Sequence, residues 1–108
     1  MSDHPTLEEI FSALAHEYRR QLLVALLEHD ALTGTEVSHY THEHVGEKEL
    51  NRLKLEMVHT HFPKLEEMGV IQWDSGPLVV RRGPQFEEIQ PLLELLQNHA
   101  NELPDDWP

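Results

Sequence analysis

The sequence predicts a mainly α-helical α+β domain that contains one two-stranded β-hairpin. Apolar residues recur at helical spacing over most of the chain, which indicates amphipathic helices. The exception is a short stretch after residue 69, where two apolar runs flank a turn signal. At 108 residues the chain fits a single domain, with residues 1–83 as its main part and residues 84–108 as a C-terminal helix and acidic tail.

Two helices are predicted within the first 30 residues. The first covers residues 7–14, where apolar side chains stand at positions i, i+3, i+4 and i+7: Leu7, Ile10, Phe11 and Leu14. Thr6 and Glu9 have the spacing of a capping box, so this helix is expected to begin after Thr6. A second apolar stripe, which starts at Tyr18, predicts a helix over about residues 16–29.

The next segment predicts a short helix between two loops. Residues 30–34 are expected to form the first loop, because Asp30, Thr33 and Gly34 are turn-forming types. Thr35 is then expected to cap a third helix that reaches Tyr40, and residues 41–46 are predicted to be the second loop.

From Glu47 the chain is predicted to be helical again. One side of this helix is lined by apolar residues: Leu50, Leu53, Met57, Phe62 and Leu65. Pro63 stands inside the pattern, where it removes a backbone donor and clashes with the preceding turn. The helix is therefore expected either to bend near His59 or to split into segments 47–57 and 58–68.

The segment His59–Ile71, with the sequence HTHFPKLEEMGVI, indicates how the helix and hairpin are joined. Gly69 can take the left-handed conformation that closes a helix, and the apolar residues after it favour a strand. The turn signal Asp74-Ser75-Gly76-Pro77 precedes a second apolar run that starts at Leu78. A helix that leads into such a hairpin is typical of a recognition helix and β-wing, so the expected fold is a winged helix-turn-helix.

A C-terminal amphipathic helix is predicted over residues 86–103. Its apolar face is larger than one small domain needs, and a homodimer contact would bury it. The alternative is packing on the first helix of the same chain. The tail LPDDWP is expected to be mobile unless Trp107 docks back. The candidate dimer residues are Phe86, Ile89, Leu92, Leu93, Leu96 and Ala100.

Composition restricts the classes of protein that remain. The chain contains no cysteine, so disulfides and thiolate metal sites are excluded. No apolar run approaches the roughly 20 residues that cross a bilayer, and residues 1–9 lack the features of a signal peptide. A cytoplasmic protein without a membrane partner is the expectation.

The net charge has the opposite sign to that of most DNA-binding domains. Twenty acidic residues face eight basic ones, which gives a net charge of −12 with neutral histidines. Either the chain does not bind nucleic acid, or it works in a high-salt cytoplasm, where repulsion is screened within about 3 Å at roughly 1 M salt. The low lysine count of three favours the second explanation and a halophilic source.

Two motifs resemble a known family. The segment IFSALAHEYRRQLLVALL is similar to the opening of ArsR-like winged-helix repressors, and HTHFPKLEEMGVI is similar to the end of their recognition helix. The resemblance is closer to a group of haloarchaeal winged-helix domain proteins that carry the same Arg19–Arg20 pair and acidic surfaces. It covers about residues 7–82 and implies a small cytoplasmic DNA-binding regulator, usually dimeric through its terminal helices. The segment GEKELNRLKLEMV lengthens the fourth helix beyond the family's usual recognition helix.

Six of the eight basic residues fall between Lys48 and Arg82, which favours a DNA-binding face there. Recognition helices present their N-terminal residues to base edges, and wing residues reach phosphates. His59, Thr60 and Lys64 are therefore expected to face the groove, flanked by Arg52 and Lys54. Arg81 and Arg82 are expected to hold phosphates. Of the remaining pair, Arg19 and Arg20, one is expected to brace the second helix through a carboxylate.

The sequence supports other functions more weakly. His39, His42 and His44 are weak metal candidates, because two of them lie only two residues apart in a predicted loop, and His61 is expected to be a core or capping residue. No catalytic constellation or cofactor motif is present, so neither an enzyme nor a cofactor is expected. The predicted function is a transcription regulator that binds double-stranded DNA as a homodimer. The alternatives are a protein-interaction adaptor of the same fold, which needs no DNA, and a histidine-based metal-responsive repressor.

Overall fold

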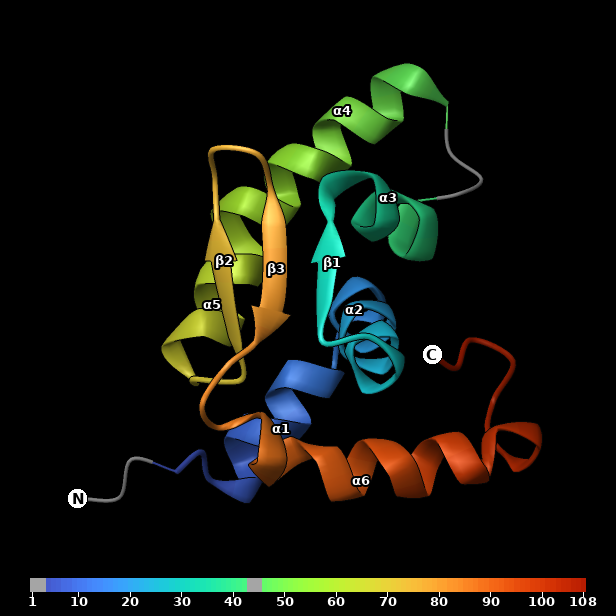
Figure 1. The fold of residues 1–108 in the computed structure, drawn as a ribbon. Coiled ribbons are helices and arrows are strands. Elements are labelled where there is room, and N and C mark those ends of the chain that lie inside the picture. Colours follow the sequence, from blue (N-terminus) through green and yellow to red (C-terminus); the bar gives the residue numbers. More distant parts are fainter. Residues whose placement is uncertain (1–3, 43–45) are drawn as a thin grey trace.

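The computed structural model describes residues 4–42 and 46–108, in which α-helices lie behind and below a small antiparallel sheet (Figure 1). This part of the protein is mostly helical, and its sheet has three strands in the order β1-β3-β2. The predicted α+β class is therefore confirmed, but the sheet has one strand more than the sequence predicted. Side chains from both ends of the chain share one hydrophobic core. Within the described residues, no helix is both long and apolar enough to span a bilayer.

Helices α1 (Leu7–Leu14) and α2 (Glu17–Glu28) begin where local capping signals stand. The Thr6 hydroxyl accepts from the Glu9 N–H at 3.2 Å, and the Thr6 N–H donates to the Glu9 carboxylate at 3.0 Å, which confirms the capping box. The His16 ring caps α2 by accepting from the Tyr18 N–H at 3.1 Å. Both helices lie within a residue of their predicted bounds, because each start satisfies backbone donors locally.

Strand β1 (Ala31–Thr33) occupies part of the predicted first loop, so that prediction was wrong. Leu32 is fully buried opposite Val80, and the strand exists only because β3 pairs with it from a distant part of the sequence. Helix α3 (Gly34–His42) is capped by Thr33, not Thr35, because Thr33 and Glu36 exchange hydrogen bonds at 3.0 and 3.3 Å. Of the predicted loop over 41–46, residues 43–45 lie outside the described residues.

Helices α4 (Glu47–Glu56) and α5 (Phe62–Glu67) are joined by a π-helical turn, η1 (Met57–His61). The Phe62 N–H donates to the Met57 carbonyl, five residues back. Pro63 accounts for the irregularity, since it has no N–H and its ring crowds the carbonyl four residues earlier; a widened turn gives the ring room. The irregular turn lies where the sequence predicted a bend or a split.

Two glycines fix the join between α5 and the hairpin, which consists of β2 (Ile71–Asp74) and β3 (Val79–Arg82). Gly69 has φ of 78°, so it closes α5 in the left-handed conformation as predicted. Gly83, the residue after β3, lies so close to this join that a Cβ added to it would stand 2.3 Å from the Gly69 carbonyl oxygen. The register pairs Trp73 with Val80 and so places the turn at residues 75–78.

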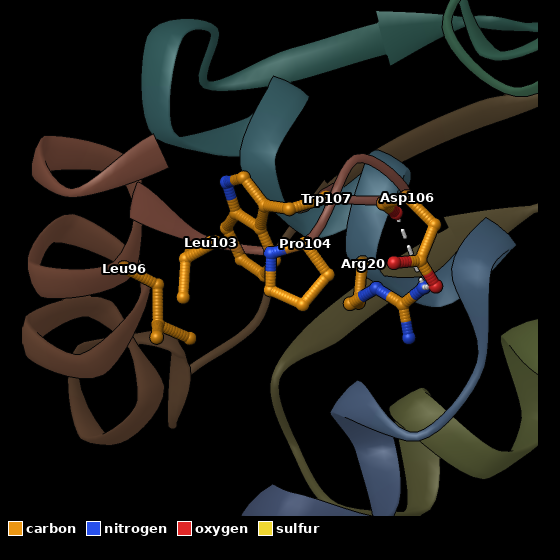
Figure 2. A pocket seen from close by; sticks show the side chains of 6 residues that line it. All are labelled: Arg20, Leu96, Leu103, Pro104, Asp106 and Trp107. Carbon is orange, nitrogen blue, oxygen red and sulfur yellow. Dashed lines mark hydrogen bonds and ion pairs between the residues drawn. The ribbon is translucent and has the colours of Figure 1, made fainter. Parts of the chain in front are cut away.

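Helix α6 (Phe86–Asn98) ends earlier than the predicted residue 103 and is followed by a short 3-10 helix, η2 (Ala100–Glu102). The tail then turns back onto α2 and α6, as Figure 2 shows. The Trp107 indole N–H donates to the Gln97 side chain at 3.0 Å, and the Arg20 guanidinium lies 3.8 Å from the Asp106 carboxylate. Trp107 packs on the core, so of the two predicted alternatives for the tail the docked one holds.

Candidate nucleic-acid interface

The side of α4 and η1 that faces away from the core carries a stripe of basic, amide and apolar side chains. On the inner side, Leu53 and Met57 are buried. Positions three and four apart share a helix face, so the opposite side presents residues spaced along one line. We define this outer stripe as Lys48, Asn51, Arg52, Leu55 and His59, all of which are exposed. No carboxylate belongs to the stripe, although α4 itself contains Glu47, Glu49 and Glu56.

Arg52 and Leu55 give the outer stripe two kinds of contact. Arg52 is ion-paired with Glu49, one turn earlier on the flank of the stripe. The hydrogen bond to Glu49 raises the pKa of Arg52 above its usual value, so the guanidinium stays charged. Leu55 is 60% exposed. The stripe therefore offers a permanent cation next to an apolar side chain.

The other residues predicted on the recognition helix point to different surroundings. Lys54 lines a groove between the start of α3, η1 and Leu78 of the hairpin turn. Thr60 is exposed on η1. Lys64 lies beside α1, where it lines a depression with Glu9 and lowers the pKa of that carboxyl, after the larger effect of Thr6. Of the five predicted recognition residues, Arg52 and His59 are brought together on one stripe, and Lys64 is not.

The two arginines of the hairpin have different roles. Arg81 is exposed and ion-paired with Asp74 across the two strands. Arg82 instead donates from Nε to the Leu26 carbonyl at 2.6 Å and from Nη2 to the Leu27 carbonyl at 2.9 Å. Its guanidinium also lies 3.2 Å from the Asp30 carboxylate. Arg82 satisfies carbonyls at the C-terminal end of α2 and so acts as a brace, and its expected role in holding phosphate stays a prediction.

A buried arginine and histidine anchor η1 to the first two helices. Arg19 is only 9% exposed and donates to the carbonyls of Ala13 and Ser12 at 2.9 and 3.0 Å. Its Nη1 lies 3.1 Å from Nδ1 of His61, and because arginine only donates, His61 accepts there. His61 is therefore the core residue that the sequence predicted. Arg20, by contrast, carries the carboxylate contact, to Asp106.

A family comparison matches the part of the chain that carries this surface. A family described as a domain of unknown function, DUF7344, matches residues 11–81, which is more than half of the chain. The chain belongs to the DUF7344 family. The match begins halfway along α1 and continues through most of β3, so the outer stripe and the hairpin turn lie inside it, whereas α6 and the docked tail lie outside. No curated protein matches this DUF7344 member.

The histidine candidates for a metal site are only partly described in this DUF7344 member. His39 is exposed on α3, whereas His44 and the side chain of His42 lie outside the described residues. Within the described part of the chain, no three histidine or acidic side chains are grouped so that they could hold a metal ion. Nothing in the described geometry therefore adds to the metal prediction.

The predicted dimer residues divide into two groups. Phe86, Ile89 and Leu93 are buried at 2%, 0% and 0% exposure within a single chain, where α6 contacts α2. These residues therefore pack within one chain, as the alternative prediction had it. The contacts shown are with α2, whereas the prediction named the first helix. Leu92 and Leu96 pack partly on the same core, Ala100 is half-buried in η2, and Leu95 is 55% exposed. Any contact between copies through α6 must use these outer residues, because the inner ones are already buried.

Three residues of the outer stripe were missed by sequence reasoning: Lys48, Asn51 and Leu55. Their signal is the helical spacing opposite Leu53 and Met57, which could have been extended to the solvent side. The expectation that contacts cluster near His59 followed from taking residues 58–68 as the recognition segment and placing its N-terminal residues against the bases.

Proposed function

We propose that this DUF7344 member is a transcription regulator that binds double-stranded DNA through a winged helix-turn-helix. In this assignment α3 and α4–η1 are the helix pair, with α4–η1 as the recognition helix, and the β2–β3 hairpin is the wing. The order of elements supports it, since a strand precedes the helix pair and the hairpin follows the recognition helix. The antiparallel sheet in the order β1-β3-β2 supports it as well.

The observation that carries the proposal is the outer stripe, which places basic, amide and apolar side chains on one exposed helix face in a chain of net charge −12. Its residue types are those that read base edges in the major groove. Arginine recognises guanine, asparagine recognises adenine, and an apolar side chain contacts the thymine methyl group. Arg52, Asn51 and Leu55 supply these chemistries from one helix face. Lys48 lies on the same face, and Arg81 on the wing, where they would meet phosphates.

We further propose that the acidic remainder of the surface suits a salt-rich cytoplasm. At molar salt, the repulsion between this surface and DNA is screened within a few ångströms, about 3 Å at 1 M. The homodimer also stays a prediction, and we expect it to use Leu92, Leu95 and Leu96, which the single chain leaves at least partly exposed.

The first experiment is a selection of bound fragments from the source genome in roughly 2 M KCl, where non-specific electrostatic binding is suppressed. The proposal predicts recovery of a shared, near-palindromic sequence. Asn51→Ala and Arg52→Ala should change which sequence is recovered, because each removes one base contact worth about 1–3 kcal/mol of discrimination.

The matched control is Lys64→Ala, compared with Lys48→Ala. Both changes remove one lysine charge, but Lys64 lies beside α1 and away from the outer stripe. Lys48→Ala should flatten the salt dependence of DNA affinity and Lys64→Ala should not. A folded wild-type protein that recovers no sequence would contradict the proposal and favour the adaptor. Equal effects of the two lysine variants would remove the outer stripe from the interface.

A further inference from the structure

A mostly apolar groove lies between three elements of the DUF7344-matched region. It has a volume of about 520 Å³ and is bounded by the start of α3, by α4–η1 and by Leu78 of the hairpin turn. Volumes of about 300–1,000 Å³ are typical of sites for small molecules. The groove is therefore large enough for a ligand.

The floor of the groove consists of core side chains. Val37, Met57 and Phe62 line the groove and are exposed by 3% or less. Val58 and Leu78 form its half-buried walls. Met57 and Val58 belong to the π-helical turn, and such turns occur frequently at functional sites. Methionine adapts to irregular apolar ligands, so the floor suits an aliphatic or aromatic body.

The rim of the groove carries one kind of charge. Lys54 is the only charged side chain among its described lining residues, and the hydroxyls of Thr35 and Ser38 also line it. The other described depressions each include a carboxylate, from Asp106, Glu17 or Glu9. In a chain with twenty acidic residues, a groove without one is electrostatically suited to an anion.

We propose that this groove binds a small apolar monocarboxylic acid. The apolar body would cover the floor, and its carboxylate would pair with Lys54 and accept hydrogen bonds from the hydroxyl rim. A monocarboxylate fits better than a nucleotide or a dicarboxylate, because one cation stands beside a mostly apolar surface. Acyl and aromatic acids share this chemistry, and the probes below distinguish them.

The proposal has a consequence that rests on the proposed DNA-binding function. Lys54 belongs to the proposed recognition helix and Leu78 to the turn of the proposed wing, so an acid in the groove would contact both elements that are proposed to meet DNA. Binding of the acid would then prevent or strongly weaken binding of DNA, and DNA would weaken binding of the acid to the same extent. The ligand test itself contains no DNA, and its result is therefore independent of whether DNA binding is correct.

The test is a titration of the full chain followed by methyl NMR at one fixed KCl concentration. The probes are decanoate and 2-naphthoate, with 1-decanol and decylammonium as controls for charge. From the ligand size we expect a dissociation constant on the order of 0.1–1 mM for one of the two acids. The shifted methyl groups should be those of Val37, Met57, Val58 and Leu78, and decylammonium should leave them unchanged.

Variants test the two halves of the site separately. Lys54→Gln should weaken binding of the acid about 5–10-fold, because it removes a charge-assisted hydrogen bond. Lys48→Gln removes the same charge from the same helix outside the groove and should change affinity less than about 2-fold. Ser38→Leu fills the groove without removing a charge and should abolish binding, with the wild-type fold confirmed by its NMR spectrum.

Three results would overturn the proposal. The first is that neither acid saturates the protein at concentrations up to ten times the expected dissociation constant. The second is that decylammonium binds as tightly as the acids. The third is that the shifted methyl groups are only those of Leu96 and Leu103, which line the pocket under Trp107. Binding of decanoate alone would assign an acyl acid, and binding of 2-naphthoate alone an aromatic acid.

Discussion

The contact of Arg19 with η1 leads to the most direct prediction about stability. Replacing Arg19 by Met keeps the length of the side chain but removes its hydrogen bonds to the Ser12 and Ala13 carbonyls and to His61. Leaving a buried polar partner unsatisfied costs about 1–3 kcal/mol each. Relief of the desolvation of a buried cation offsets part of this, since burial already lowers the pKa of Arg19. We expect a net loss of about 3–4 kcal/mol.

Urea unfolding at constant KCl measures this loss. With a slope of about 1.3 kcal/mol per molar urea, the midpoint should fall by roughly 2–3 M. Arg20→Met is the control, because Arg20 contacts one helix carbonyl at 2.9 Å and an exposed carboxylate, and it should cost about 1 kcal/mol. His61→Phe combined with Arg19→Met should show coupling of about 1 kcal/mol or more. A loss below 1 kcal/mol for Arg19→Met, or additive effects in the double variant, would refute the network.

Three further variants test other contacts. Arg82→Ala should destabilise the fold by about 2–3 kcal/mol in urea unfolding, because the C-terminal carbonyls of α2 lose their donor, whereas Arg81→Ala should stay within 0.5 kcal/mol; equal losses would contradict the brace. Gly83→Ala should cost about 3 kcal/mol or more by the same measurement, and Gly76→Ala, with nothing within 4 Å of its added Cβ, should be near neutral. Burial, followed by Arg19, lowers the pKa of His16 below its ordinary 6.5, so the unfolded chain binds the proton more tightly. Stability contributed by neutral His16 should therefore be complete above pH 6.5 and decline as the pH falls below it, and His16→Asn should remove this part of the slope while keeping the cap.

Elements with local signals were predicted well from the sequence. Helix α1 begins at a capping box that involves only Thr6 and Glu9, and the α5–β2 join needs only the backbone freedom of Gly69. The irregular turn η1 was anticipated from Pro63, which restricts the backbone whatever surrounds it. In each case the cause and the effect lie within six residues of each other, so no knowledge of the tertiary fold was required.

Elements set by distant contacts were not predicted. Strand β1 has three residues and acquires its conformation from β3, so its sequence resembles a loop. Arg82 looked like a surface cation because the carbonyls that it satisfies belong to α2, far earlier in the chain. The groove beside Lys54 depends on three elements at once, and the sequence gives no sign of it. Contacts of this kind require the folded arrangement.

The distribution of basic residues in the fold decides what kind of DNA binding this protein could perform. Arg19, Arg20 and Arg82 are occupied by backbone carbonyls, and Lys64 lies beside α1. Four cations remain on or beside the proposed interface, namely Lys48, Arg52, Lys54 and Arg81, and two of them, Lys48 and Arg81, are proposed to meet phosphates. Four phosphate contacts are therefore the upper limit, and they correspond to a salt slope of about −3.6, so a tenfold rise in salt would weaken electrostatic affinity at most about 4,000-fold.

This low cation count favours discrimination over non-specific affinity. The ion pairs of Arg52 with Glu49 and of Arg81 with Asp74 are exposed, and such pairs are worth at most about 1 kcal/mol, so exchanging a carboxylate for a phosphate costs little. In molar salt, binding to random sequence would be negligible, and the affinity would come from base contacts and DNA shape, which salt screens far less. A domain with few cations on its outer stripe is therefore suited to select a specific DNA site in high salt. At low salt its acidic surface would repel DNA.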